Sequence, residues 1–227
     1  MLKPLHTPEI TDPRRKDRRK TGRASIVAGG FSLLELMITV AIVLVISALA
    51  LPTLQVIRSA RLREAGSDYA SLLQSARVQA IQGDAYYPVI LQAGPPAQAF
   101  IDLKGTGAYV AGDPMVALPS SVVARNYSDN PPGLANLETQ ALASASDPSL
   151  DTADNPTFGP RGLPCKPIAS GGYTTCPAFS GAVSGTSYIT FFQSMPDKTW
   201  EAVVTNPASR IRIYTCSPSS STWSLAQ

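Results

Sequence analysis

Glu35 is the one charged residue in an apolar run that extends from Phe31 to Leu51. A carboxylate in apolar surroundings loses its hydration, and a cation or several hydrogen-bond donors must replace the lost water. An isolated acid in such a segment is therefore usually functional and has a partner. We expect Glu35 to form an ion pair; the structural alternative is a side chain that reaches the polar end of its helix.

Three cysteines, Cys165, Cys176 and Cys216, lie in the last third of the chain. An odd number leaves one thiol over once a disulfide has formed. Cys165 and Cys176 are close in sequence within a segment rich in Pro and Gly, so we predict a disulfide between them. The other two pairings remain open. Disulfides persist in oxidising compartments, which agrees with an exported C-terminal part.

Arg210 and Arg212 alternate with apolar residues in "RIRIYTC" (210–216). Alternation places both on one face of a strand, about 6.8 Å apart, because a strand rises ~3.4 Å per residue. Two guanidinium groups at this spacing suit DNA phosphates. The alternative is a solvated strand face, which we favour because the neighbouring cations are scattered along the sequence.

The residues after position 30 contain no histidine, because the only one is His6. A Ser–His–acid or Cys–His nucleophile is therefore excluded there, and the cysteines lack the spacing of a zinc site. We interpret "DNPPG" (129–133) as a turn rather than a calcium loop, and "GTG" (105–107) as a turn rather than a phosphate loop. We predict no catalytic residue, no metal, no cofactor and no enzymatic activity.

The charge of the chain is divided unevenly between its N-terminus and the rest. Residues 1–30 hold eight Lys and Arg against three acids, whereas residues 31–227 hold 11 Lys and Arg against 13 acids, a formal charge of −2.

The 21 residues from Phe31 to Leu51 form an apolar run that matches the length of a helix that crosses a hydrocarbon core of ~30 Å. A basic block before such a helix keeps the N-terminus cytoplasmic. We therefore expect a single membrane pass over 31–53.

The elements that position these residues follow from the hydrophobic pattern. Residues 54–82 form an amphipathic continuation of the helix with one apolar stripe, and Pro52 predicts a kink between the two halves. Strands and turns dominate residues 83–227, with strands at 88–92, 99–103, 187–192, 200–206 and 210–216. The segment 129–156 carries five acids, four Pro and no Lys or Arg, and is expected to be a flexible surface loop.

The stretch "GGFSLLE" (29–35) closely resembles the processing signature of type IV prepilins and of type II secretion pseudopilins. The resemblance implies cleavage between Gly30 and Phe31 by prepilin peptidase, removal of the leader 1–30 and N-methylation of Phe31. It also implies that Glu35 pairs with the Phe31 amine of a neighbouring subunit. The implied fold class is α+β and pilin-like, with a long kinked helix, transmembrane in its first half, packed on an antiparallel β-sheet head.

Two further stretches are similar to the GspH/FimT group within that family. They are "ARVQAIQGDAYYPVIL" (76–91) and "FGPRGLP" (158–164), and "SRIRIYTC" (209–216) resembles the basic strand that closes the group's head. In the FimT branch this strand begins Gly-Arg-x-Arg, an element implicated in DNA uptake, whereas Ser209 stands at the first position here. The departure weakens the transfer of DNA binding to Arg210 and Arg212.

The resemblance implies a structural role, that of a GspH-like minor pseudopilin assembled near the tip of a periplasmic filament that drives type II protein secretion. The alternative is a FimT/FimU-like minor pilin that acts in pilus assembly or DNA uptake. The expected partners are prepilin peptidase, other pseudopilins or pilins, and inner-membrane lipid, with DNA as a less favoured partner. The expected location is the inner membrane, with the head in the periplasm.

Overall fold

The computed structural model describes residues 32–92, 97–142, 150–152, 155–166, 168–170, 173–175, 186–195, 197–217 and 219–226. The side chains of 48–55, 168–170 and 173–175 lie outside this description. The chain forms two units, residues 1–45 and 46–227. The backbone is helical at Pro52, and the predicted kink there stays a prediction; the predicted cleavage pair Gly30 and Phe31 lies outside the described residues.

Helix α1 spans Leu33–Gly83, 51 residues. Within the second unit, the apolar stripe of this helix is buried along its whole length. This confirms the prediction, made from apolar residues that recur about every 3.6 positions, of which face of the helix is packed. The buried side chains are Leu62, Ala65, Tyr69, Leu72, Leu73, Ala76 and Ala80. Tyr69 fixes this face to the sheet, since its hydroxyl is 3.1 Å from Thr190 Oγ1 and its ring meets Phe192 edge-on at 5.3 Å.

The predicted membrane span is wrong. Among the residues that the structure describes, no helix is long and apolar enough to cross a membrane. The predicted fold class, with a transmembrane helix half, and the predicted single-pass location in the inner membrane are both corrected by this finding.

Within the described residues, the strands form two larger sheets and one strand pair. The first sheet has the order β3-β2-β1-β6-β7, the second the order β13-β12-β11-β10-β4 with β5 added to β10, and β8 pairs with β9. All pairings are antiparallel except that of β5 with β10. The bounds in the first sheet are β1 Tyr87–Gln92, β2 Gln98–Ile101, β3 Met115–Ala117, β6 Thr157–Phe158 and β7 Pro164–Cys165. In the second they are β4 Val122–Arg125, β5 Leu150–Asp151, β10 Ser187–Ser194, β11 Trp200–Thr205, β12 Ile211–Cys216 and β13 Trp223–Leu225, and the pair consists of β8 Ile168–Ser170 and β9 Tyr173–Thr175.

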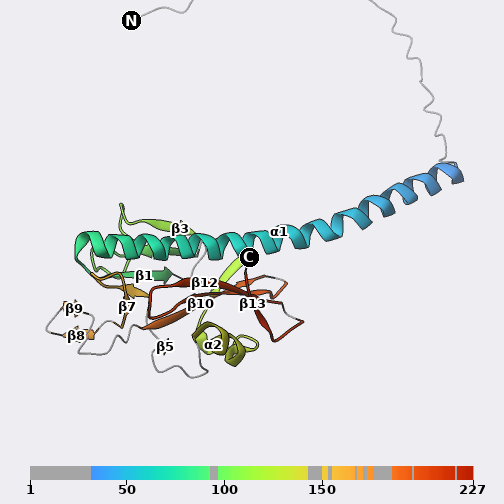
Figure 1. Cartoon of the computed structure of the whole chain (residues 1–227). Helices are drawn as coiled ribbons and strands as arrows, with labels where there is room; N and C mark the ends of the chain where they lie inside the picture. The colour runs from blue at the N-terminus through green and yellow to red at the C-terminus, as the bar shows by residue number, and fades with distance from the viewer. Residues whose placement is uncertain are drawn as a thin grey trace, which may run out of the picture. The chain divides into compact units, whose positions relative to one another are not determined.

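The second sheet is covered on both faces (Figure 1). Alternate residues of β11 belong to different cores: Val203 packs in the core that α1 covers, whereas Ala202 and Val204 pack in the core that α2 covers. Every residue of β11 is therefore buried, as expected for a strand in the middle of a three-layer arrangement. Glu201 takes the same side as Val203 and faces α1.

The segment 129–156 is not a loop throughout, in contrast to the prediction. A short 3₁₀ turn, η1, covers Tyr127–Asp129, and helix α2 covers Leu134–Leu142. Leu137 of α2 is fully buried beside Trp223, whose indole N–H donates to the Pro132 carbonyl at 2.8 Å. Burial of one apolar face of α2 outweighs the loop-like composition of the surrounding residues.

Candidate functional site

Glu35 lies in the first turn of α1, where Ser32 caps the helix. The Glu35 N–H donates to Ser32 Oγ at 3.2 Å, and a carboxylate in the first turn is favoured by the helix dipole. Ser-Leu-Leu-Glu has the spacing of a capping box, a local role that the sequence interpretation missed. Only half of the box is formed, because the described residues offer the Glu35 carboxylate no hydrogen bond or ion pair. Its charge remains available to a partner.

The residues that follow Glu35 are apolar around the whole circumference of the helix. Eleven large apolar side chains are exposed by half or more of their surface, namely Leu33, Leu34, Leu36, Met37, Ile38, Val40, Ile42, Val43, Leu44, Val45 and Ile46. A helix that is apolar on all sides is stable in water only when other apolar groups cover it. We call residues 33–46 the apolar segment.

Arg210 and Arg212 are both exposed, as a solvated strand face requires. Ser209, however, has φ 60°, the left-handed conformation that glycine adopts most readily. Its buried hydroxyl donates to the Gly162 carbonyl, and its own carbonyl accepts from Arg77 Nη1 at 3.5 Å. The backbone at Ser209 thus has the geometry that a glycine would give, although the residue type differs.

The turn that contains Gly162 completes a basic corner. Gly162 has φ 69°, a conformation that other residues adopt only with strain, and a Cβ there would lie 2.7 Å from Ile81 Cδ1, so a larger residue would have to displace the Ile81 side chain. The contact between Ser209 and Gly162 places exposed Arg161 and exposed Arg210 on either side of it. We define Arg77, Arg161, Arg210 and Arg212 as the basic corner; the sequence interpretation treated Arg161 as scattered because it is far from Arg210 in the chain.

The loops considered for metal or phosphate use their polar groups locally. The Asp129 carboxylate accepts from the Asn126 N–H at 3.0 Å, and the Asp102 carboxylate accepts from the N–H groups of Thr106 and Gly107 at 3.1 and 2.6 Å. Where the structure describes the chain, no group of three or more His, Cys, Asp or Glu side chains is placed to hold a metal ion.

The cysteines differ in state. Cys216 is a free thiol and is buried, and Cys165 is disulfide-bonded. The predicted partner Cys176 lies outside the described residues, so the pairing of Cys165 with Cys176 stays a prediction.

Comparison with protein-family models, with curated proteins and with solved structures gave no match.

Proposed function

We propose that the chain is a structural subunit of a filament, a minor pseudopilin of a type II secretion system that is assembled near the filament tip. Prepilin peptidase cleaves it between Gly30 and Phe31 and methylates the new amine of Phe31. The observation that carries the proposal is the apolar segment, which is exposed on all sides and bears one carboxylate that has no partner among the described residues. Such a segment requires neighbours that are apolar and that supply one cation.

The same segment of adjacent subunits meets both requirements. Full burial of one Leu, Ile, Val or Met side chain is worth about 1.5–3 kcal/mol, so covering eleven of them favours association strongly even after the entropic cost of binding. Cleavage before Phe31 creates a cationic amine four residues from Glu35. In a bundle of such helices, the amine of one subunit pairs with the carboxylate of the next and sets their register.

A charge placed in the apolar segment tests this packing. We expect Leu44→Asp to lower the amount of the chain in the filament fraction isolated from disrupted cells by roughly 100-fold, because the new carboxylate would be buried without a partner. Ser67→Asp adds the same charge at an exposed position of α1 in the second unit and is expected to change nothing. Equal recovery of Leu44→Asp and the native chain would contradict the proposal.

A second candidate function is that of a FimT/FimU-like minor pilin that binds DNA. The basic corner favours it, because Ser209, at the position of the glycine in the Gly-Arg-x-Arg element, has a backbone conformation that glycine adopts readily, and because Arg161 and Arg77 lie beside it. The formal charge of −2 on residues 31–227 limits long-range attraction to DNA. We therefore keep this function second to the structural one.

DNA binding is measured best on the chain from Phe31 onward, since the basic leader would bind DNA by itself. If the second function holds, Arg210→Ala/Arg212→Ala weakens duplex binding at low salt about 10-fold or more and lowers the salt dependence by about two phosphate contacts. Lys104→Ala removes an exposed cation elsewhere and is the control. A mobility shift that is absent, or that the double variant retains, rejects DNA binding by the basic corner.

A further inference from the structure

The basic corner adjoins two exposed apolar side chains near the C-terminal end of α1. Val78 and Ile81, three residues apart on the helix surface, are 49% and 50% exposed. Ile81 and Arg77 both reach the turn at Gly162, where a Cβ would lie 2.7 Å from Ile81 Cδ1 and 3.2 Å from Arg77 Nε. Interfaces between proteins combine apolar groups with arginine, whereas contacts with DNA are mainly polar, so this mixed surface favours a protein partner.

The guanidinium groups of the corner have donors to spare. Arg161 and Arg210 are exposed and form no ion pair within the described part of the chain. Arg77 donates to the Ser209 carbonyl at 3.5 Å through one of its nitrogens. A guanidinium group carries five N–H donors, and its shape matches the two oxygens of a carboxylate. A protein partner of this corner is therefore expected to present carboxylates.

The chain itself presents two such carboxylates on another part of α1. Glu64 and Asp68 are both exposed and form no ion pair among the described residues. Residues four apart lie on one face of a helix, ~6 Å from each other. Ile57, which is 48% exposed, lies on the same face two turns before Glu64. We define Ile57, Glu64 and Asp68 as the acidic face.

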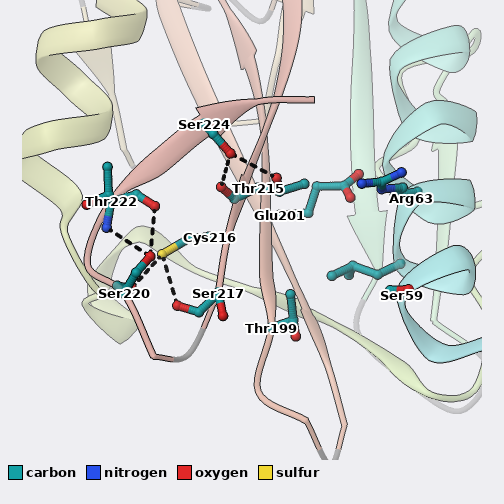
Figure 2. A pocket seen from close by; sticks show the side chains of 11 residues that line it. Ser59, Arg63, Thr199, Glu201, Thr215, Cys216, Ser217, Ser220, Thr222 and Ser224 are labelled. Atoms are coloured by element: carbon teal, nitrogen blue, oxygen red, sulfur yellow. Dashed lines mark hydrogen bonds between the residues drawn. The ribbon is translucent and has the colours of Figure 1, made fainter. Parts of the chain in front are cut away.

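The cations in this part of α1 leave the acidic face with an excess of negative charge. Arg58 pairs with Asp197 at 2.9 Å. Arg63 lies on another side of the helix, where its charge acts on Glu201 (Figure 2). Arg61 lies beside the two carboxylates and offsets one of them. The acidic face and the basic corner are therefore opposite in sign, and each carries exposed aliphatic groups.

The two surfaces occupy different places on the chain. Glu64 and Arg77 are separated by ~20 Å along the helix, at 1.5 Å per residue. A contact that joins two different surfaces of the same chain is heterologous, so it repeats from each copy to the next. Such a contact forms an open filament whenever the rotation between copies does not close a ring.

We propose that the basic corner of one copy of the chain docks on the acidic face of a second copy. The arginines of the corner pair with Glu64 and Asp68, and its aliphatic side chains pack toward Ile57. The inference rests on the proposed filament function and adds to it a subunit contact outside the apolar segment. Complementary charge selects the partner and the register, whereas the apolar segment supplies most of the affinity.

Cross-linking of two differently tagged copies in the isolated filament fraction tests this contact. One copy carries Asp68→Cys and the other Arg210→Cys, and a short bismaleimide joins their thiols. We expect a cross-linked dimer that contains both tags. Glu64→Arg in the first copy is expected to lower the dimer yield about 5-fold because like charges then face each other, and Arg161→Glu in the second copy is expected to restore it.

Lys104→Cys in place of Arg210→Cys is the matched control, because Lys104 is an exposed cation outside the basic corner, and it is expected to give no dimer. Recovery of the chain in filaments depends on the apolar segment and is expected to be the same for all these variants. Filaments that hold both copies without a dimer, or a yield that ignores charge reversal, overturn the contact and leave the filament function standing.

Two further outcomes also overturn the contact. Absence of the native chain from the filament fraction overturns both the contact and the filament function. Duplex DNA binding that Arg161→Glu/Arg210→Glu removes, with no dimer in the filaments, assigns the basic corner to DNA instead of a second copy.

Discussion

Replacing Glu35 by alanine is expected to leave the second unit folded and to abolish incorporation of the chain into filaments. Glu35 is a member of neither core of the second unit, so its replacement takes no side chain out of those cores. In the filament, however, the methylated Phe31 amine of the adjacent subunit would be buried without its counter-charge. Removing one partner of a buried ion pair costs about 3–5 kcal/mol, which corresponds to a loss of roughly 100-fold or more.

The filament fraction is quantified against total chain in the same cells. Glu35→Gln keeps the shape and hydrogen-bonding capacity of the side chain but not its charge, and it is expected to fail as Glu35→Ala does. Glu64→Ala removes an exposed acid from the same helix and is expected to assemble normally. Normal incorporation of Glu35→Gln would show that assembly does not require the charge of Glu35 and would contradict the ion pair.

The stability of the second unit is expected to fall as pH rises from about 4.5 to 7, because of Glu201. Burial raises the pKa of this carboxyl to about 7 in the folded chain, against 4.5 when unfolded. The folded state therefore binds more protons in this window, so the free energy of unfolding decreases as pH rises. A difference of about 2.5 pKa units corresponds to about 3 kcal/mol, complete at pH 8.

Glu201→Gln removes the titration while keeping the side chain's size. We expect the variant to be about 3 kcal/mol more stable than the native chain at pH 8 and nearly equal at pH 4.5, as measured by urea unfolding at the two pH values. Arg63 on α1 is the charged group that faces Glu201, and Cys216 on β12 has its own pKa raised by burial and stays neutral throughout. Parallel pH profiles of variant and native chain would contradict this assignment.

Three strands of the second sheet could be predicted because their local pattern agrees with their final environment. "SYITFF", "WEAVVTN" and "RIRIYTC" are rich in β-branched and aromatic residues and are bounded by turns, and they became β10, β11 and β12. The apolar stripe of α1 was predictable for the same reason. Helix α2 was missed because its nine residues stand within a segment of Pro, Ser and acids, although Leu134 and Leu137 already show a helical spacing.

The polar features depend on contacts between distant residues, and the sequence carries no local signal for them. In the sequence, Glu201 looks like an ordinary strand residue. Only the structure shows that it lies against Gly66 of α1. In the sequence, Ser209 differs from the glycine of the Gly-Arg-x-Arg element. Only the structure shows that its backbone is left-handed and that its hydroxyl donates a hydrogen bond to the Gly162 carbonyl. The membrane span was predicted from an apolar run of 21 residues, whereas no helix among the described residues is long and apolar enough for one.

The proposed filament assembly requires cleavage between Gly30 and Phe31, after which the exposed apolar segment packs against the same segment of neighbouring subunits. Mass spectrometry of the chain recovered from filaments of cells with active prepilin peptidase tests this most directly. We predict an N-terminal peptide that begins with N-methylated Phe31 and no peptide from residues 1–30. Recovery of an intact leader, with Phe31 internal and unmodified, would contradict the account.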